Sequence, residues 1–236
     1  MILIIALFSM VSPVVYPQAL PEWYIPLREA VYEQVLTADA VYPIYIGVSS
    51  RARSSLSGYE QNMILSRSEY MMGRAYLFED RKNEASARFE SGMDYARRAL
   101  DIKETAEAWV MLSENLSQNI ACRSTLYAMA NGLNVEKYAK NALSISPRNA
   151  AAQYLIAARW VYAPSPFNNL RRGIEMMTAI QTEGDMSKDD MFNVYSAIGY
   201  AYIQQKNNAQ AREWLNRSLV VYPTNKFAGS LLADLR

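Results

Sequence analysis

The feature that most restricts the fold of this chain is a helical apolar period that begins near Ser54 and continues almost to the C-terminus. Apolar residues recur there at intervals of three and four, the spacing of one face of an α-helix. The segments between these runs are short and rich in turn residues, as in DIKE, SISPRN, YAPSPFNN, QQKNN and YPTN. Amphipathic helices joined by such turns cannot bury their apolar faces alone, so we expect helix pairs that stack on one another.

The helix pairs recur with a period of about 34 residues. The clearest copy is the segment 192–225, in which small residues fall where two helices would cross and larger residues lie on either side. This pattern resembles the tetratricopeptide repeat (TPR). The positions that carry the resemblance are Tyr195, Ile198, Gly199 and Tyr202 in the first helix, then Ala211, Leu215, Ser218 and Pro223 in and after the second.

Four such pairs are predicted, at about 54–101, 105–146, 149–181 and 189–221. The looser copies depart from the pattern: Glu69 replaces an apolar residue, and Pro147 arrives late, which we interpret as an insertion over 119–132. The segment 226–236 predicts a C-terminal capping helix, and 20–53 a helical N-terminal cap in which AVYPIYIGVSS has no clear assignment. The predicted fold is therefore all-α, a right-handed α-solenoid of about four TPR-like pairs (54–225) with an extra N-terminal helix.

The first 19 residues have the character of a signal peptide. Residues 1–15 are apolar and uncharged, but they are too few, and interrupted by Pro13, for a helix that spans a membrane. The small residue Ala19 precedes the polar start of the next segment, as a cleavage site requires. We therefore expect a periplasmic or secreted protein with no integral membrane span and, since no cysteine lies near residue 19, no lipid anchor. The alternative is a buried N-terminal strand or helix of a cytosolic protein.

The composition argues against several kinds of chemistry. The sequence contains no histidine, which removes Ser-His-Asp triads and imidazole metal sites, and its one cysteine, Cys122, cannot form an intramolecular disulfide. The 24 basic and 23 acidic side chains leave a net charge of +1, so no net field attracts nucleic acid. The adjacent acids at 104–107 and 185–190 are interpreted as helix caps. We expect no enzymatic activity, no cofactor and no metal.

The TPR resemblance also implies where a partner would bind. In that family the first helix of each pair lines a concave groove, which commonly binds peptides or partner domains. Tyrosine and arginine side chains in such a groove are typical of interface hot spots, although some tyrosines would instead wedge adjacent pairs together. The residues that the register places in the groove are Arg67, Tyr70, Arg74, Glu107, Val110, Glu114, Gln118, Tyr154, Ala158, Tyr162, Asn193, Ser196, Tyr200 and Gln204.

Two functions follow from this interpretation. The first is a non-enzymatic scaffold of the bacterial periplasm or cell envelope that binds a protein or peptide in its concave groove. The alternative rests on a weaker similarity, to the periplasmic TPR proteins associated with TRAP solute transporters, which also have about four degenerate helix pairs and long extra helices. On that interpretation the chain would be an accessory protein that binds a small-molecule ligand or the solute-binding subunit.

Overall fold

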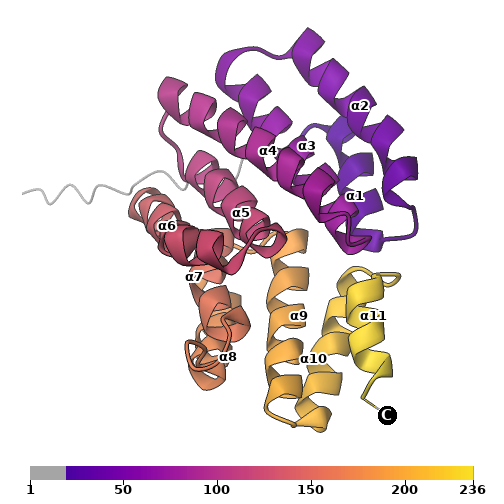
Figure 1. The fold of residues 1–236 in the computed structure, drawn as a ribbon, viewed down its shortest axis with the longest axis vertical. Coiled ribbons are helices and arrows are strands. Elements are labelled where there is room, and N and C mark those ends of the chain that lie inside the picture. The colour runs from indigo at the N-terminus through magenta and orange to yellow at the C-terminus, as the bar shows by residue number, and fades with distance from the viewer. Residues whose placement is uncertain (1–19, 236) are drawn as a thin grey trace, which may run out of the picture.

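The computed structural model describes residues 20–235, and all of its regular elements there are helices (Figure 1). The segment 1–19, on which the signal-peptide prediction falls, lies outside the described residues. A short 3₁₀ turn at Glu22–Tyr24 is followed by α1 (Ile25–Glu33), α2 (Ala38–Ser55), α3 (Gly58–Phe78), α4 (Lys82–Ile102), α5 (Ala106–Cys122), α6 (Thr125–Ile145), α7 (Ala150–Tyr162), α8 (Leu170–Glu183), α9 (Lys188–Gln204), α10 (Asn208–Val221) and α11 (Lys226–Ala233).

Most helix starts are set by local side-chain chemistry. Asparagine, serine and threonine side chains accept a hydrogen bond from a free N–H in the first turn, an arrangement worth about 1 kcal/mol at each helix. At α9 the cap is reciprocal, because Asp190 Oδ2 accepts from the N–H of Ser187 at 2.9 Å while Ser187 Oγ accepts from the N–H of Asp190 at 3.2 Å. Side-chain caps occur at Thr37, Thr105, Ser124, Asn149, Asn169, Ser187, Asn207 and Asn225.

The predicted helix pairs are present as α3–α4, α5–α6, α7–α8 and α9–α10, and their crossings use the small residues of the repeat. A Cβ atom at Gly73 would lie 2.5 Å from Phe89 of α4, and one at Gly199 would lie 2.8 Å from Leu215 of α10. Real Cβ atoms do not approach other heavy atoms so closely, so glycine is required where these helices touch. The all-helical solenoid fold is thereby confirmed.

Gly199 offers a direct test of this packing. Gly199→Leu should force α9 and α10 apart, because Leu215 already fills the space that the new side chain needs. We expect a loss of about 1 to 3 kcal/mol in the free energy of unfolding, measured by denaturant titration. Gly229→Ala in α11 is a matched control, since a Cβ there meets nothing within 4 Å. Equal unfolding midpoints for Gly199→Leu and the wild type would show that the register is wrong.

Two segments differ from the sequence-based expectation. Residues 119–132 do not form an inserted loop, because α5 continues to Cys122 and α6 already begins at Thr125. The extra length is helical and leaves Leu126, Met129 and Leu133 exposed along one face of α6. The unassigned AVYPIYIGVSS lies within α2, with Pro43 inside the helix. Packing explains this, since the residues that α2 buries (Val41, Tyr45, Val48 and Ala52) recur at three and four despite the β-branched composition.

The departure at Glu69 also has a structural reason. This side chain of α3 is buried, and its carboxylate accepts a hydrogen bond from Tyr45 Oη at 2.7 Å and lies 3.4 Å from Arg88 Nη1 of α4. Burial and the adjoining carboxylate raise the pKa of Tyr45 to about 12. One polar cluster thus replaces the apolar contact of the repeat and joins α2, α3 and α4.

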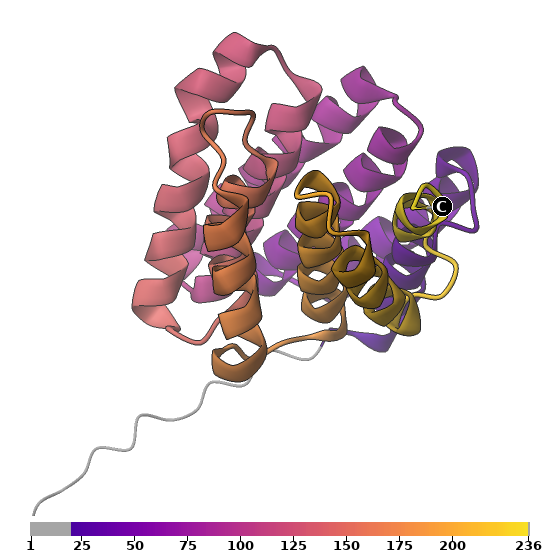
Figure 2. The ribbon, with the colours of Figure 1, turned by 90° about the horizontal axis from the view of Figure 1, so that it is seen from below.

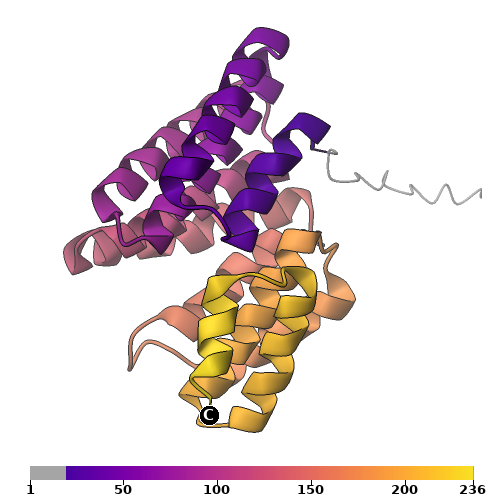
Figure 3. The same cartoon turned by 90° about the vertical axis from the view of Figure 1, so that its right-hand side faces the viewer.

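The two ends of the helical stack meet (Figures 2 and 3). In Figure 3 the indigo N-terminal helices lie directly above the gold and yellow C-terminal helices. Asn225 Nδ2 donates to the carbonyl of Tyr32 at 2.6 Å, Thr224 Oγ1 donates to the carbonyl of Glu33 at 2.8 Å, and Gln34 accepts from the N–H of Lys226 at 2.8 Å. The N-terminal cap therefore packs against the last repeat as well as the first, and α1 covers part of the concave side.

Candidate binding cavity on the concave side

A cavity of roughly 330 Å³ lies on the concave side, between α1 and the inner faces of α3, α5 and α9, with the first turn of α7 completing its wall. It brings together side chains from five stretches of the chain that are separated in sequence. Six of the fourteen residues that the register places in a groove line this cavity: Arg67, Tyr70, Glu107, Val110, Glu114 and Asn193.

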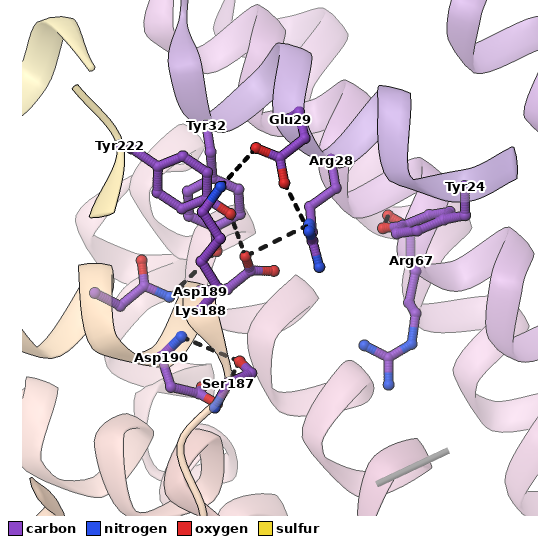
Figure 4. A network of polar contacts seen from close by, with 11 residues as sticks. Tyr24, Arg28, Glu29, Tyr32, Arg67, Ser187, Lys188, Asp189, Asp190 and Tyr222 are labelled. Carbon is purple, nitrogen blue, oxygen red and sulfur yellow. Dashed lines mark hydrogen bonds and ion pairs between the residues drawn. The ribbon is translucent and has the colours of Figure 1, made fainter. Parts of the chain in front are cut away.

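One wall of the cavity is a polar network between α1 and α9 (Figure 4). Asp189 of α9 accepts a hydrogen bond from Tyr222 Oη at 2.6 Å, and its carboxylate lies 3.8 Å from Arg28 Nε. Lys188 Nζ binds the Glu29 carboxylate at 2.8 Å, and Arg28 binds the same carboxylate at 2.6 Å. Burial and the Asp189 carboxylate raise the pKa of Tyr222, which therefore remains a hydrogen-bond donor. These contacts hold α1 in place over the cavity.

Tyr32 of α1 packs between Arg74 of α3 and Tyr222, next to this network. The Arg74 guanidinium of α3 lies 4.3 Å from the centre of the Tyr32 ring, and Tyr32 in turn stacks on Tyr222 with a centroid separation of 4.7 Å. Arg74 is only 8% exposed, and its Nη1 atom has no hydrogen-bond partner among residues 20–235. Aromatic faces thus take the place of a carboxylate partner for this cation.

The register placed several of these residues in an open groove, and the structure shows where each one lies. Tyr70, Arg74, Val110 and Ser196 are buried and do not form an open groove surface, although Tyr70 and Val110 line the cavity beneath α1. The Arg74 side chain packs against three aromatic rings, so it contributes to the packing of the fold. Whether any of the fourteen residues binds a partner stays a prediction.

The remaining groove residues lie nearer the ends of α5, α7 and α9. Tyr162 is 44% exposed, and its ring centre lies 5.3 Å from that of Tyr200. Tyr154 and Ala158 are partly buried and pack against the core between α7, α8 and α9, which fits the wedge alternative for Tyr154. Gln118 is partly buried and Gln204 is exposed.

Glu114 is one of the acidic residues that line the cavity. No hydrogen bond to its carboxylate is formed within residues 20–235, and burial together with the Asp190 and Asp189 carboxylates raises its pKa to about 7, against the opposing effect of Arg67 and Arg74. The Arg67 guanidinium extends away from the network in Figure 4, while its backbone carbonyl lies 3.5 Å from Tyr24 Oη. The cavity therefore contains charged groups that the fold itself does not neutralise by direct contact.

The sequence pattern missed the part of the wall that α1 and two interhelical turns supply. Arg28 and Tyr24 come from the N-terminal cap, and Asn149 and Ser187 cap α7 and α9 at the edge of the cavity. The amphipathic run LREAVYEQVL indicated a helix, but nothing in its period shows which surface it covers. The capping motifs were visible in the sequence, although their shared location was not.

The other residues considered for chemistry have structural roles. Asp190 belongs to the α9 cap, and Glu104 accepts a hydrogen bond from Trp109 Nε1 at 2.9 Å. Burial raises the pKa of the Cys122 thiol, which disfavours the reactive thiolate. Within residues 20–235 no group of three or more acidic or cysteine side chains is placed to bind a metal ion, and no helix there is long and apolar enough to cross a membrane.

The comparisons with known proteins include a likeness to a solved structure. A solved structure described as YrrB, a TPR protein with an unusual peptide-binding site, aligns with 90% of this chain and 98% of its own at 15% identity and a TM-score of 0.38. No protein-family model and no curated protein matches the sequence. The packing of this chain defines its fold class, an α-solenoid of TPR-like helix pairs. Gly73 packs against Phe89 in the first pair, and Gly199 packs against Leu215 in the fourth.

Proposed function

We propose that this chain is a non-enzymatic interaction scaffold that binds a protein or peptide partner on its concave side. The observation that supports this function is the convergence of α3, α5 and α9 on one cavity whose charged side chains are not all used by the fold. Concave sites with aromatic walls and a few polar groups are where proteins usually bind ligands. Outside this cavity, Tyr162 of α7 is exposed, and its ring packs against that of the partly buried Tyr200 of α9.

Crosslinking in the native host tests this proposal. A photoreactive amino acid at Tyr162, which is exposed on α7, should form one dominant crosslinked product that mass spectrometry identifies. The same amino acid at the exposed Lys137 of α6 is the matched control and should not form it. Tyr162→Ala and Tyr200→Ala should each weaken retention of that partner by about 1 to 4 kcal/mol, while Lys137→Ala should not. Partner retention that none of these changes affects would exclude the inner surface as the binding site.

The cavity also supports the alternative function, an accessory protein of a TRAP solute transporter that binds a small molecule. A volume of roughly 330 Å³ lies at the lower end of the range of small-ligand sites. A small ligand would be retained when the protein is purified natively and would be detected by mass spectrometry after denaturation. The scaffold function instead predicts that no small molecule is retained and that a macromolecule is crosslinked.

We further propose that the protein acts in the periplasm, after cleavage near Ala19. This proposal is supported by the uncharged apolar character of residues 1–15 and the small residue before the polar segment. N-terminal sequencing of the protein from its native host should find a chain that begins near Leu20. A chain that still begins at Met1 in the cytosolic fraction would contradict both the cleavage and the location.

A further inference from the structure

The strongest unexplained feature of the cavity is the carboxylate of Glu114. It is one of five carboxylates that line the cavity, against two guanidinium groups. Three of the five have partners: Asp185 lies 3.0 Å from Arg148 Nη2, Asp189 accepts from Tyr222, and Asp190 accepts from Ser187. Of the two cations, Arg28 is paired with Glu29 at 2.6 Å. Among residues 20–235, the cavity groups without a direct partner are Glu107, Glu114 and Arg67, which together carry one more negative than positive charge.

Part of the wall of the cavity that contains Glu114 is apolar. The same cavity is lined by the aromatic side chains of Tyr24, Tyr32 and Tyr70 and by Met71 and Met111. A carboxylate in a cavity that also has aromatic and apolar wall residues suits a ligand with an aliphatic stem and a cationic head, because the stem can pack on the rings while the head pairs with the acid. An anionic or purely apolar ligand would leave Glu114 uncompensated.

We propose that this cavity binds an ammonium or guanidinium group carried on an aliphatic chain, with Glu114 as its partner. This inference rests on the proposed function, because a lysine or arginine side chain of a bound peptide is the source that it favours. Arg67 opposes the ligand by its own positive charge, and Glu107 adds to the attraction. A free aliphatic amine has the same chemistry and is distinguished from the peptide by the experiment.

The experiment is isothermal titration of the purified full chain with three probes. The first is a five-residue alanine peptide with blocked ends and one central lysine, the second is the same peptide with norleucine in place of lysine, and the third is 1,5-diaminopentane. We expect the lysine peptide to bind at least about tenfold more tightly than the norleucine peptide, since a hydrogen bond to a charged group contributes about 1.5 to 3 kcal/mol. Tighter binding of the diamine than of the peptide would identify a free amine as the ligand.

Three variants locate the binding. Glu114→Gln should lose at least about tenfold in affinity for the lysine peptide, whereas Glu175→Gln, an exposed acid of α8 in an ion pair with Arg171, should not change it. Arg67→Met should raise the affinity severalfold because it removes the like charge. In each folded variant, circular dichroism should be that of the wild type. The chemical shift of the Glu114 side-chain carboxyl should also show a lower pKa when the lysine peptide is bound.

Equal binding of the lysine and norleucine peptides, or unchanged binding to Glu114→Gln, would overturn the cation site. A partner crosslinked from Tyr162, together with no binding of any cationic probe, would overturn this inference and leave the scaffold function in place. Cation binding that requires Glu114, together with no crosslinked partner, would support the site and contradict the scaffold function.

Discussion

Tyr32→Ala should destabilise the protein by about 3 to 5 kcal/mol, the cost usual for removing a large buried aromatic side chain. The ring of Tyr32 stacks on Tyr222 at 4.7 Å, meets Phe192 edge-on at 5.7 Å and lies 4.3 Å below the Arg74 guanidinium. Its hydroxyl also accepts a hydrogen bond from Asn193 at 3.3 Å. The substitution leaves a cavity between the two ends of the stack and a buried cation without its nearest ring.

Denaturant unfolding followed by circular dichroism measures this loss. Tyr42→Ala is the matched control, because Tyr42 of α2 is 37% exposed and lies away from the junction. The control should change the free energy of unfolding much less than Tyr32→Ala. If both variants unfold at the same denaturant concentration, α1 does not join the two ends of the stack as the structure shows.

Glu114→Gln should have the opposite effect and stabilise the protein at high pH, by an amount on the order of 2 kcal/mol. The folded state raises the pKa of Glu114 from 4.5 to about 7, mainly through burial. An acid whose pKa is raised on folding stabilises the folded state while it is protonated, and this contribution is lost as the pH rises through the folded pKa. Below pH 4.5 the wild type and the variant should therefore be equally stable, and above pH 7 the glutamine variant should be more stable.

Thermal unfolding at pH 4 and pH 8 tests whether Glu114→Gln stabilises or destabilises the protein at each pH. Other charged and titratable groups share this region with Glu114. They lie on the 3₁₀ turn (Tyr24), α1 (Tyr32), α3 (Arg67, Tyr70 and Arg74), α7 (Tyr154) and α9 (Asp189 and Asp190). The quantity compared is therefore the difference in melting temperature between the variant and the wild type at each pH. Glu175→Gln, which changes an exposed acid, is the control. A glutamine variant that is less stable than the wild type at pH 8 would show that the Glu114 carboxylate already has a partner.

A higher stability of Glu114→Gln at high pH would also indicate that Glu114 has a role in binding. A carboxylate that costs stability in the unbound protein and lines a cavity is typical of a group retained for binding, since binding sites often lower the stability of the fold that carries them. Gln at position 114 would then raise the melting temperature and lower the affinity for a cationic probe. The two measurements together separate a binding group from an acid that is only poorly placed.

The helix pairs themselves could be predicted from the sequence because their determinants are local. The apolar period of three and four places one face of each helix inward, and glycine at positions such as 73 and 199 follows from the contact that its own partner helix makes. The same reasoning failed at 119–132, where the late Pro147 indicated an insertion without showing that the added residues extend α5 and α6. It also left α2 unassigned, because β-branched residues and Pro43 obscured a helical period that packing against α3 enforces.

The sequence by itself determined the class of fold, the pairing of neighbouring helices and six residues of the cavity wall, since each depends on contacts within one repeat or between adjacent repeats. Only the tertiary structure decided that α1 returns to the last repeat, that Tyr32 meets Tyr222, and that Arg74 is buried rather than exposed. Those contacts join residues almost 200 positions apart, as between Tyr32 and Asn225. No local period encodes such a separation, because it depends on the curvature that all the helix pairs accumulate together.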